Sequence, residues 1–367
     1  MSEHSTEGKT TEQSFPGKIA IITNGASLGV DIFCAADQLI EKYGAEKIIH
    51  VCWPEDFMTR QDEIINMVAR LAEDMEIKVL ILNQAIPGTN AAIDKFRETR
   101  NDVFIIYCII HESISESSRH ANLILELNEL DIGSAMVKQA KKQGAKVFVH
   151  YSSPRHMALA PLAKRRDLIR DACMAEGIQF VHITAPDPAG PAGLATAQQF
   201  ILDEVPKLAA RYGEDTAFFA TKCALQAPLI KAVVDCHAIY PQPCCPSPFH
   251  GFPEALGIKT GEGVDDLKYI ISEACRIAAE KDMTDRLSTW PVSASMMFTN
   301  AGAEYAIKWI NGEVSRNRID SRVLEECMSD YIKEVVGEGI EVEMNACSEN
   351  GISYDNFKLI LMSYLDF

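Results

Sequence analysis

The first residues with recognisable chemistry lie in a glycine-containing turn near the amino-terminus. The stretch "KIAIITNGASLGVD", residues 18–31, passes from an apolar run through Thr23, Asn24 and Gly25 into a segment with helical periodicity. Such a turn can hold a phosphate with its backbone amides where glycines let the backbone come close. It can instead present a polar side chain to an uncharged ligand. These alternatives predict different classes of protein.

The phosphate alternative is tested by the T-G-x-x-x-G-x-G pattern of short-chain dehydrogenases, which the turn resembles. When Thr23 is aligned with the threonine, the glycine positions fall on Asn24, Leu28 and Val30. Tyr-x-x-x-Lys occurs only as Tyr43–Lys47 and Tyr354–Lys358, which are not where that fold needs its catalytic pair. Because both patterns fail, no cofactor is expected. An α/β oxidoreductase with a nucleotide cofactor stays as the alternative function.

Other catalytic and metal-binding patterns are sparse. The chain has no P-loop, no G-x-S-x-G and no H-E-x-x-H, so no catalysis is implied. Its 11 cysteines include no C-x-x-C pair. Cys244, Cys245 and His250 share a proline-rich segment, residues 239–256, but no third cysteine or further histidine follows at metal-ligand spacing. We expect no metal site, and the segment is either a rigid lip over a binding site or a packed structural loop.

Composition narrows the class of protein further. The 367 residues are 47% hydrophobic and 24% charged, which is typical of globular domains. The net charge is -17, so a nucleic-acid partner is not expected. No apolar run approaches the roughly 20 residues that span a bilayer.

The elements that position these residues alternate between apolar strands and amphipathic helices. Strands such as "KVLIL" and "VFIIYCII" are unbroken apolar runs, which is typical of parallel strands covered on both faces. The alternation continues too long for one sheet, so we predict two doubly wound, Rossmann-like α/β domains. In the second half of the chain, we expect strands at "HAIYPQ" and "WPVSAS", and a final helix, strand and helix at 320–336, 340–346 and 354–364.

Polar side chains collect where the predicted strands end, and open parallel sheets bind ligands at that edge. Hydrogen-bonding groups of this kind bind carbohydrates and similar small ligands. Taken singly, each also suits a turn or a helix N-cap. The predicted ligand-binding residues are Asn24, Glu55, Asn83, Gln84, His111, Asn128, Ser152, His156, Asp187, Thr221 and Gln242.

Several stretches resemble the type 1 periplasmic binding proteins. They are "KIAIITN", "NQAIPGTNAAIDKFRETRNDVFIIYC" and "LELNELDIGSAMVKQAKKQGAKVFVHY", in which Asp131-Ile132-Gly133 opens the helix after a crossover. The resemblance covers residues 18–312. "RRDLIRDACMAEGIQFVHITAPDPAGPAG" and "IYPQPCCPSPFHGFPEALGI" resemble an uncharacterised bacterial branch of that superfamily, whose members are similar to lipid-anchored solute receptors encoded beside transporter genes.

The resemblance implies two domains joined by a multi-strand hinge, with a small polar ligand in the cleft between them. We expect a flexible leader at 1–17, a first domain at 18–128 plus 296–318, and a second at 129–295 plus part of 319–367. The implied partner is an ABC transporter permease. The implied location is extracytoplasmic, lipid-anchored or periplasmic, if a signal segment was removed, and cytoplasmic otherwise. A cytoplasmic ligand-sensing regulator with this fold but without a DNA-binding domain is a further alternative.

Overall fold

The computed structural model describes residues 14–26, 29–260 and 266–367, and its chain divides into two units. Unit 1 comprises Met1–Glu126, Ser295–Tyr331 and Met344–Leu359, and unit 2 comprises Leu127–Ala294, Ile332–Glu343 and Ile360–Phe367. The domain limits expected from the sequence, 18–128 plus 296–318 and 129–295 plus part of 319–367, stay predictions. Most of the predicted leader lies outside the described residues.

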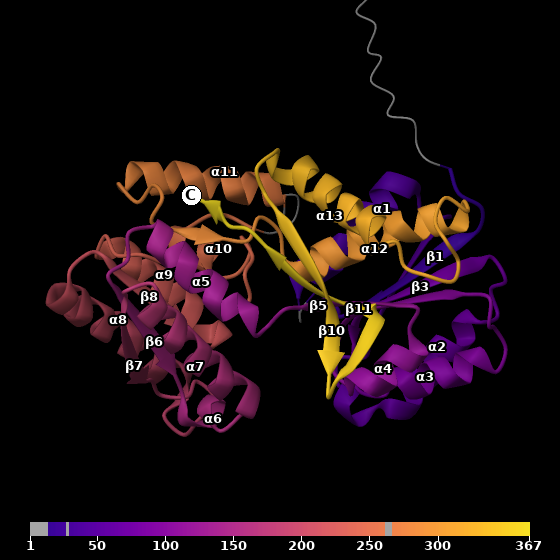
Figure 1. The fold of residues 1–367 in the computed structure, drawn as a ribbon, viewed down its shortest axis with the longest axis horizontal. Coiled ribbons are helices and arrows are strands. Elements are labelled where there is room, and N and C mark those ends of the chain that lie inside the picture. The colour runs from indigo at the N-terminus through magenta and orange to yellow at the C-terminus, as the bar shows by residue number, and fades with distance from the viewer. Residues whose placement is uncertain (1–13, 27–28, 261–265) are drawn as a thin grey trace, which may run out of the picture. The chain divides into compact units, whose positions relative to one another are not determined.

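Unit 1 is built on a seven-stranded sheet in the order β10-β11-β5-β4-β3-β1-β2 (Figure 1). The strands of this sheet are β1 (Lys18–Thr23), β2 (Ile48–Cys52), β3 (Ile77–Ala85), β4 (Phe104–Ile110), β5 (Leu123–Leu127), β10 (Val342–Glu349) and β11 (Ile352–Met362). The accompanying helices are α1 (Val30–Tyr43), η1 (Phe57–Thr59), α2 (Gln61–Leu71), α3 (Thr89–Arg97), α4 (Ile114–His120), α12 (Ala294–Ile310) and α13 (Ser321–Val336). Strands β1 to β5 pair in parallel.

Both faces of this sheet are buried, as the apolar strands predicted. Apolar residues of α2 and α3 pack with alternate residues of β1, β3 and β4 in one core. On the opposite face α12 approaches so closely that a Cβ at Gly302 would lie 3.6 Å from Ile106 of β4. The parallel strands are therefore shielded from water on both sides, which is the environment that continuous apolar strands need.

Unit 2 contains a three-stranded parallel sheet in the order β7-β6-β8 (Figure 1). Its strands are β6 (Val147–Ser152), β7 (Gln179–Thr184) and β8 (Thr216–Ala220), and β9 (Ser288–Thr289) pairs separately with β12 (Leu365–Asp366). Its helices are α5 (Asp131–Lys142), α6 (Pro154–Met157), α7 (Ala160–Ala175), α8 (Gly193–Tyr212), η2 (Cys223–Leu225), α9 (Gln226–Asp235), α10 (Phe252–Leu256) and α11 (Leu267–Glu280). One face packs on α5 and α7, and the other on α8, α9 and α11.

Three predicted elements were wrong. Residues 354–362 of the segment 354–364 belong to strand β11, not to a helix, because pairing with β5 and β10 outweighs the helix-like spacing of their apolar residues. "WPVSAS" forms no strand, since α12 begins at Ala294. "HAIYPQ" contributes only isolated bridges at Ile239 and Tyr240. Pro241 and Pro291 lack the N–H group that a strand ladder requires.

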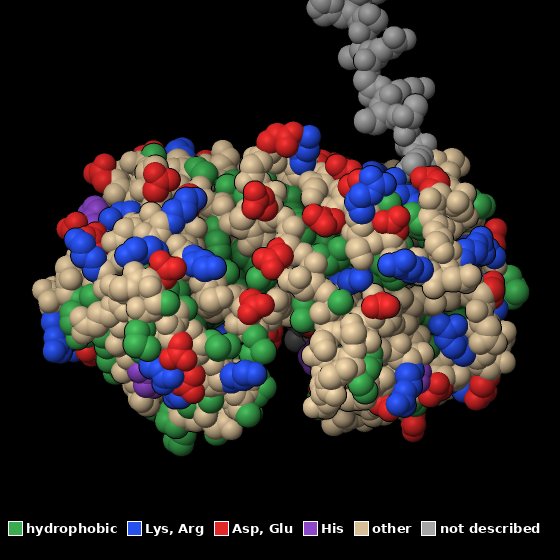
Figure 2. Space-filling view, in the orientation of Figure 1, with side chains coloured by type: hydrophobic (Ala, Val, Ile, Leu, Met, Phe, Trp, Pro, Cys, Tyr) green, Lys and Arg blue, Asp and Glu red, His purple; other side chains and the backbone are tan. Residues whose placement is uncertain are grey.

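The surface carries both signs of charge. On the face seen in Figure 2, acidic and basic side chains are interspersed over each unit. Among the described residues, no helix combines the length and apolar character that crossing a bilayer requires.

Candidate functional site

In each unit the strand order contains one point at which the winding direction of the sheet reverses, and polar side chains can converge there at the carboxyl ends of the strands. In unit 1 the order β4-β3-β1-β2 places the switch in winding direction between β1 and β3, and in unit 2 the order β7-β6-β8 places it between β6 and β8. Ligands of open α/β sheets bind beside the carboxyl ends of the strands at such a point.

At the unit 1 switch point, two amide side chains keep an acceptor without a partner. Asn24 follows β1 and is 6% exposed, and its Oδ1 has no hydrogen-bond donor among the described residues. Asn83 lies in β3, one position beyond the pair Ile22–Leu82. Its Nδ2 donates to the Ser295 carbonyl at 2.9 Å and to Thr299 Oγ1 at 2.6 Å, whereas its Oδ1 is likewise unpartnered in the described part of the chain. Each oxygen is therefore a buried acceptor without a donor among the described residues.

Gln84, Trp53 and His111 form a second group beside the end of β3. Trp53 Nε1 donates to the Gln84 carbonyl at 2.9 Å, and His111 Nε2 lies 3.1 Å from Gln84 Oε1. His111 is exposed, and so is Glu55, which follows β2. This group offers solvent-facing hydrogen-bonding atoms beside the end of β3.

At the unit 2 switch point, Ser152, His156 and Thr221 come together. Ser152 ends β6 and is 2% exposed, and its Oγ has no partner within the described ranges. His156 Nδ1 lies 3.0 Å from Thr221 Oγ1, which joins α6 to the end of β8. Burial, with the nearby Lys222 ammonium, lowers the pKa of His156, so its imidazole is neutral at pH 7. Neutral imidazole and hydroxyl groups can each donate or accept a hydrogen bond.

A charged group borders this cluster at the end of β7. Arg155 Nε and Nη2 donate to the two carboxylate oxygens of Asp187 at 2.6 and 3.2 Å, and Lys222 Nζ lies 3.5 Å from Asp187 Oδ1. The Arg155 hydrogen bonds hold the pKa of Asp187 well below its usual value. Asp187, Arg155 and Phe200 help to line a pocket of about 610 Å³. Asp187 is therefore an ionised acceptor beside two cations.

Asn128 and Gln242 have local structural roles. Asn128 Nδ2 donates to Asp131 Oδ2 at 2.8 Å and its Oδ1 accepts from the Asp131 N–H at 3.3 Å, which fixes the start of α5. Gln242 is 2% exposed, accepts from the Tyr364 hydroxyl and donates to the Pro243 carbonyl at 3.2 Å. These bonds use the oxygen and one of the two amide N–H groups of each side chain.

Sequence reasoning missed three side chains that matter here. Arg155 and Lys222 were not chosen although each stands within four residues of a strand end, because arginine and lysine at such positions are usually solvated. Trp53 was not predicted either, although it directly follows β2. The pairing of Arg155 with Asp187 depends on the adjacency of β6 and β7, which a single sequence does not reveal.

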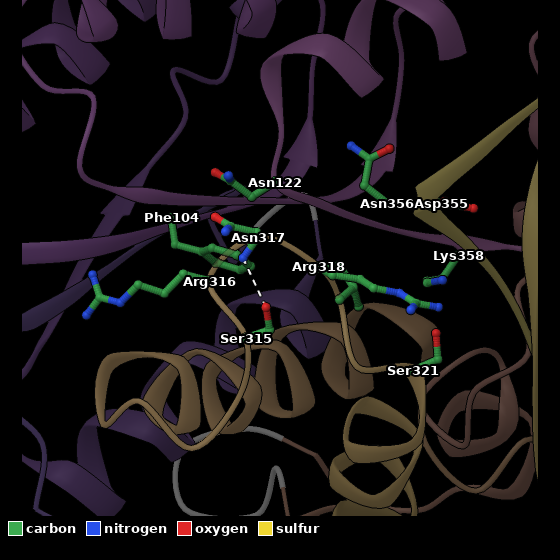
Figure 3. Close-up of a pocket in the computed structure, with 11 residues that line it drawn as sticks. Phe104, Asn122, Ser315, Arg316, Asn317, Arg318, Ser321, Asp355, Asn356 and Lys358 are labelled. Carbon is green, nitrogen blue, oxygen red and sulfur yellow. Dashed lines mark hydrogen bonds between the residues drawn. The ribbon is translucent and has the colours of Figure 1, made fainter.

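A further pocket, of about 230 Å³, lies at the opposite edge of the unit 1 sheet (Figure 3). It is lined by residues at the amino ends of β4 and β5, the loop before α13, and β11. Figure 3 shows Arg318 and Lys358 directed toward one another, while Arg316 points away and stacks on Trp309 with 4.8 Å between guanidinium and ring. This pocket contains none of the predicted ligand-binding residues.

Comparison with known proteins identifies the fold and the family. A crystal structure of a proposed transcriptional regulator from Clostridium difficile 630 matches with a TM-score of 0.86 and 20% identity, over 96% of this chain and 100% of that chain. A sugar ABC transporter protein from Actinomyces odontolyticus ATCC 17982 matches with a TM-score of 0.51 and 11% identity, over 84% of this chain and 86% of that one. These likenesses show the type 1 periplasmic binding protein fold.

The sequence relatives lead to the same superfamily branch. An uncharacterised protein of Treponema pallidum (strain Nichols) is 33% identical over 178 residues, which is 47% of this chain and 80% of that protein. The family model described as "Protein of unknown function (DUF3798)" matches residues 17–288. The predicted superfamily and its uncharacterised bacterial branch are confirmed, and the chain belongs to the DUF3798 family.

Proposed function

We propose that this protein is a solute-binding protein that closes on a small polar ligand, sugar-like or another small metabolite, in a cleft between its two units. The observation that carries the proposal is the unpartnered Oδ1 of Asn24 and of Asn83 at the switch point of unit 1, together with the unpartnered Ser152 Oγ at that of unit 2. Buried polar atoms are normally hydrogen-bonded, so each costs free energy until a donor reaches it. A ligand hydroxyl supplies that donor.

The chemistry of both edges favours a neutral, hydroxyl-rich ligand. Asn24 and Asn83 offer acceptors, whereas His156, Thr221 and Ser152 can donate or accept. Polyols and monosaccharides carry several hydroxyls that act as donor and acceptor at once, so they can satisfy such a mixed set. In this proposal the ligand acts by biasing a hinge equilibrium toward a closed state.

The fold comparisons support the proposed transporter partner and location. The similar protein from Actinomyces odontolyticus is described as a sugar ABC transporter, which supports an ABC transporter permease as partner and an extracytoplasmic, lipid-anchored or periplasmic location. The alternative is a cytoplasmic ligand-sensing regulator. It is favoured by the description of the similar Clostridium difficile protein as a proposed transcriptional regulator. Ligand binding is common to both.

The proposal is tested by a thermal-shift screen of the unmodified protein with pentoses, hexoses, sugar alcohols, nucleosides, NAD and NADP. A compound that binds only the folded state raises the melting temperature. We expect stabilisation by a monosaccharide or polyol and none by NAD or NADP. Stabilisation by a dinucleotide alone would favour the oxidoreductase alternative and overturn the proposal.

Variants then locate the binding site with the compound that the screen identifies. Asn24→Ala and Thr221→Val should each weaken its affinity at least tenfold, because each removes one hydrogen bond to the ligand. Asn66→Ala and Thr196→Val alter the same residue types on exposed helix surfaces and serve as controls. If both test variants bind as tightly as the controls, the ligand lies elsewhere.

A further inference from the structure

Three side chains that can bind metal ions converge in unit 2, and one of them lies two residues after the proposed ligand contact Thr221 in the chain. They are Cys223 at the start of η2, and Cys244 and His250 in the proline-rich segment before α10. Their candidate ligand atoms all lie within 4.8 Å of one another. Cys223 is the third ligand that the sequence analysis did not find, because 21 residues separate it from Cys244.

The sulfur spacing fits a metal centre. Cys244 Sγ lies 3.6 Å from Cys223 Sγ and 3.9 Å from Cys245 Sγ. Two thiolates of a tetrahedral zinc centre, each with a Zn–S bond of about 2.3 Å, stand about 3.8 Å apart. A disulfide requires about 2.05 Å between the sulfurs. The observed separations bracket the zinc value and far exceed the disulfide value.

The histidine is oriented as a metal ligand would be. His250 Nδ1 lies 3.0 Å from the Cys245 carbonyl oxygen. Because a carbonyl oxygen only accepts, Nδ1 carries the proton, and the lone pair is on Nε2. Histidine ligands commonly donate their second ring N–H to a backbone carbonyl, which fixes both the tautomer and the ring plane.

The backbone around the cluster is held in place before any ion binds. Gln226 Nε2 donates to the carbonyls of Ala220 and Lys222 at 3.0 and 2.6 Å, and its Oε1 accepts from the Tyr240 hydroxyl at 2.5 Å. Gly251 has φ +84°, and a Cβ there would come within 2.9 Å of Gln226 Cβ. Glycine therefore lets the segment that carries His250 pack against the helix that follows Cys223.

We propose that Cys223, Cys244 and His250 bind a Zn²⁺ ion, with the neighbouring Cys245 thiolate as the fourth ligand. Thiolate and imidazole ligands together select zinc over the hard cations. A closed set of four protein ligands is the arrangement of a structural centre. The ion would join η2 to the proline-rich segment and so stabilise the region between β8 and α10. Cys223 and Cys245 are exposed, which gives the ion access from solvent.

The test uses the full chain, fully reduced, stripped with a chelator and freed of it by desalting. Co²⁺ is titrated while thiolate-to-cobalt charge-transfer absorption is recorded, and Zn²⁺ is then added as competitor. We expect one equivalent of Co²⁺ to bind with this absorption and to be displaced by Zn²⁺. The melting temperature should rise when Zn²⁺ is added to the stripped protein.

Three variants decide which residues bind the ion. Cys223→Ser and His250→Gln should each weaken Co²⁺ affinity at least tenfold and abolish the thermal shift with Zn²⁺. Cys236→Ser is the matched control, since Cys236 is partly exposed in the same unit and stands apart from the cluster, and it should behave as the unmodified protein. Circular dichroism of each metal-free variant shows whether it is folded. If a variant is unfolded, Cys245→Ser, which alters an exposed ligand, takes its place.

Three outcomes would overturn the proposal. The first is reduced protein that gives no charge-transfer absorption with Co²⁺. The second is Cys223→Ser protein that binds Co²⁺ as tightly as Cys236→Ser. The third is a Cys223–Cys244 disulfide, found by mass spectrometry of the unreduced protein, in a protein that binds no metal after reduction. The two cysteines would then form a redox couple and not a metal site.

Discussion

The most quantitative prediction concerns His150, which is buried in β6 at 1% exposure. Its ring packs near Phe219 and Phe180, with centroids 5.6 and 6.0 Å away, and its Nδ1 lies 3.3 Å from His182 Nδ1. Burial lowers the pKa of His150 to about 3, and the His182 ring and the Arg165 and Arg166 guanidinium groups on α7 act in the same direction. The folded protein therefore holds His150 neutral.

The sign and size of the effect follow from that pKa. An unfolded histidine has a pKa near 6.5, so below this pH the unfolded state binds a proton that the folded state rejects. Above pH 6.5 the neutral, buried His150 does not lower the free energy of unfolding. Below pH 6.5 the free energy of unfolding falls steadily until the pH approaches 3. At pH 5 the loss is about 2 kcal/mol, since each pH unit below 6.5 costs up to about 1.4 kcal/mol.

The assay is urea unfolding at pH 7.5, 6 and 5, with each protein compared with its own value at pH 7.5. His150→Phe should lose about 2 kcal/mol less between pH 7.5 and pH 5 than the unmodified protein. His237→Asn is the control, because His237 is exposed and its φ of 53° is tolerated by asparagine. Equal acid sensitivity of His150→Phe and the unmodified protein would refute the buried, neutral state of His150.

Three further substitutions are predicted to change the free energy of unfolding in urea titrations. Asn83→Ala should cost about 1–3 kcal/mol, since it leaves two buried acceptors without their donor, and a cost below 0.5 kcal/mol would contradict those bonds. Gly251→Ala should cost about 1–3 kcal/mol more than the control Gly144→Ala. Both glycines have positive φ, but only at Gly251 would an added Cβ meet other atoms, so equal costs would contradict that packing. Lys358→Met should raise the free energy of unfolding by about 1 kcal/mol. Lys358 is 7% exposed, burial lowers its pKa, and no ion-pair partner is found among the described residues. A lower free energy of unfolding would contradict this prediction.

The sequence was most informative where a single physical requirement dominates. Unbroken apolar runs such as Val79–Leu82 are typical of strands buried on both faces, and they predicted the parallel sheets directly. β11 was mistaken for a helix because its apolar residues also fit a 3.6-residue period, and the sheet that decides between the two is assembled from segments far apart in the chain.

For the sites, the limit was spatial adjacency. Asn24 and Thr221 could be chosen because the edge of a parallel sheet is implied by strand order, and the turn after β1 indeed leads into α1 at Val30. Leu28, on which part of the argument against a phosphate site rests, lies outside the described residues. The Arg155–Asp187 pair and the approach of Cys223 to Cys244 arise from packing between separate segments, so residue spacing along the chain could not reveal them.

The central claim, that this protein binds a small polar solute and not a dinucleotide, is tested most directly by isothermal titration calorimetry of the unmodified protein. The titrants are the monosaccharide or polyol that gives the largest thermal shift, NAD and NADP. The account predicts one site with micromolar or tighter affinity for the sugar-like compound and no measurable heat with either dinucleotide. Micromolar affinity for NAD or NADP, with no binding of any sugar or polyol, would contradict it.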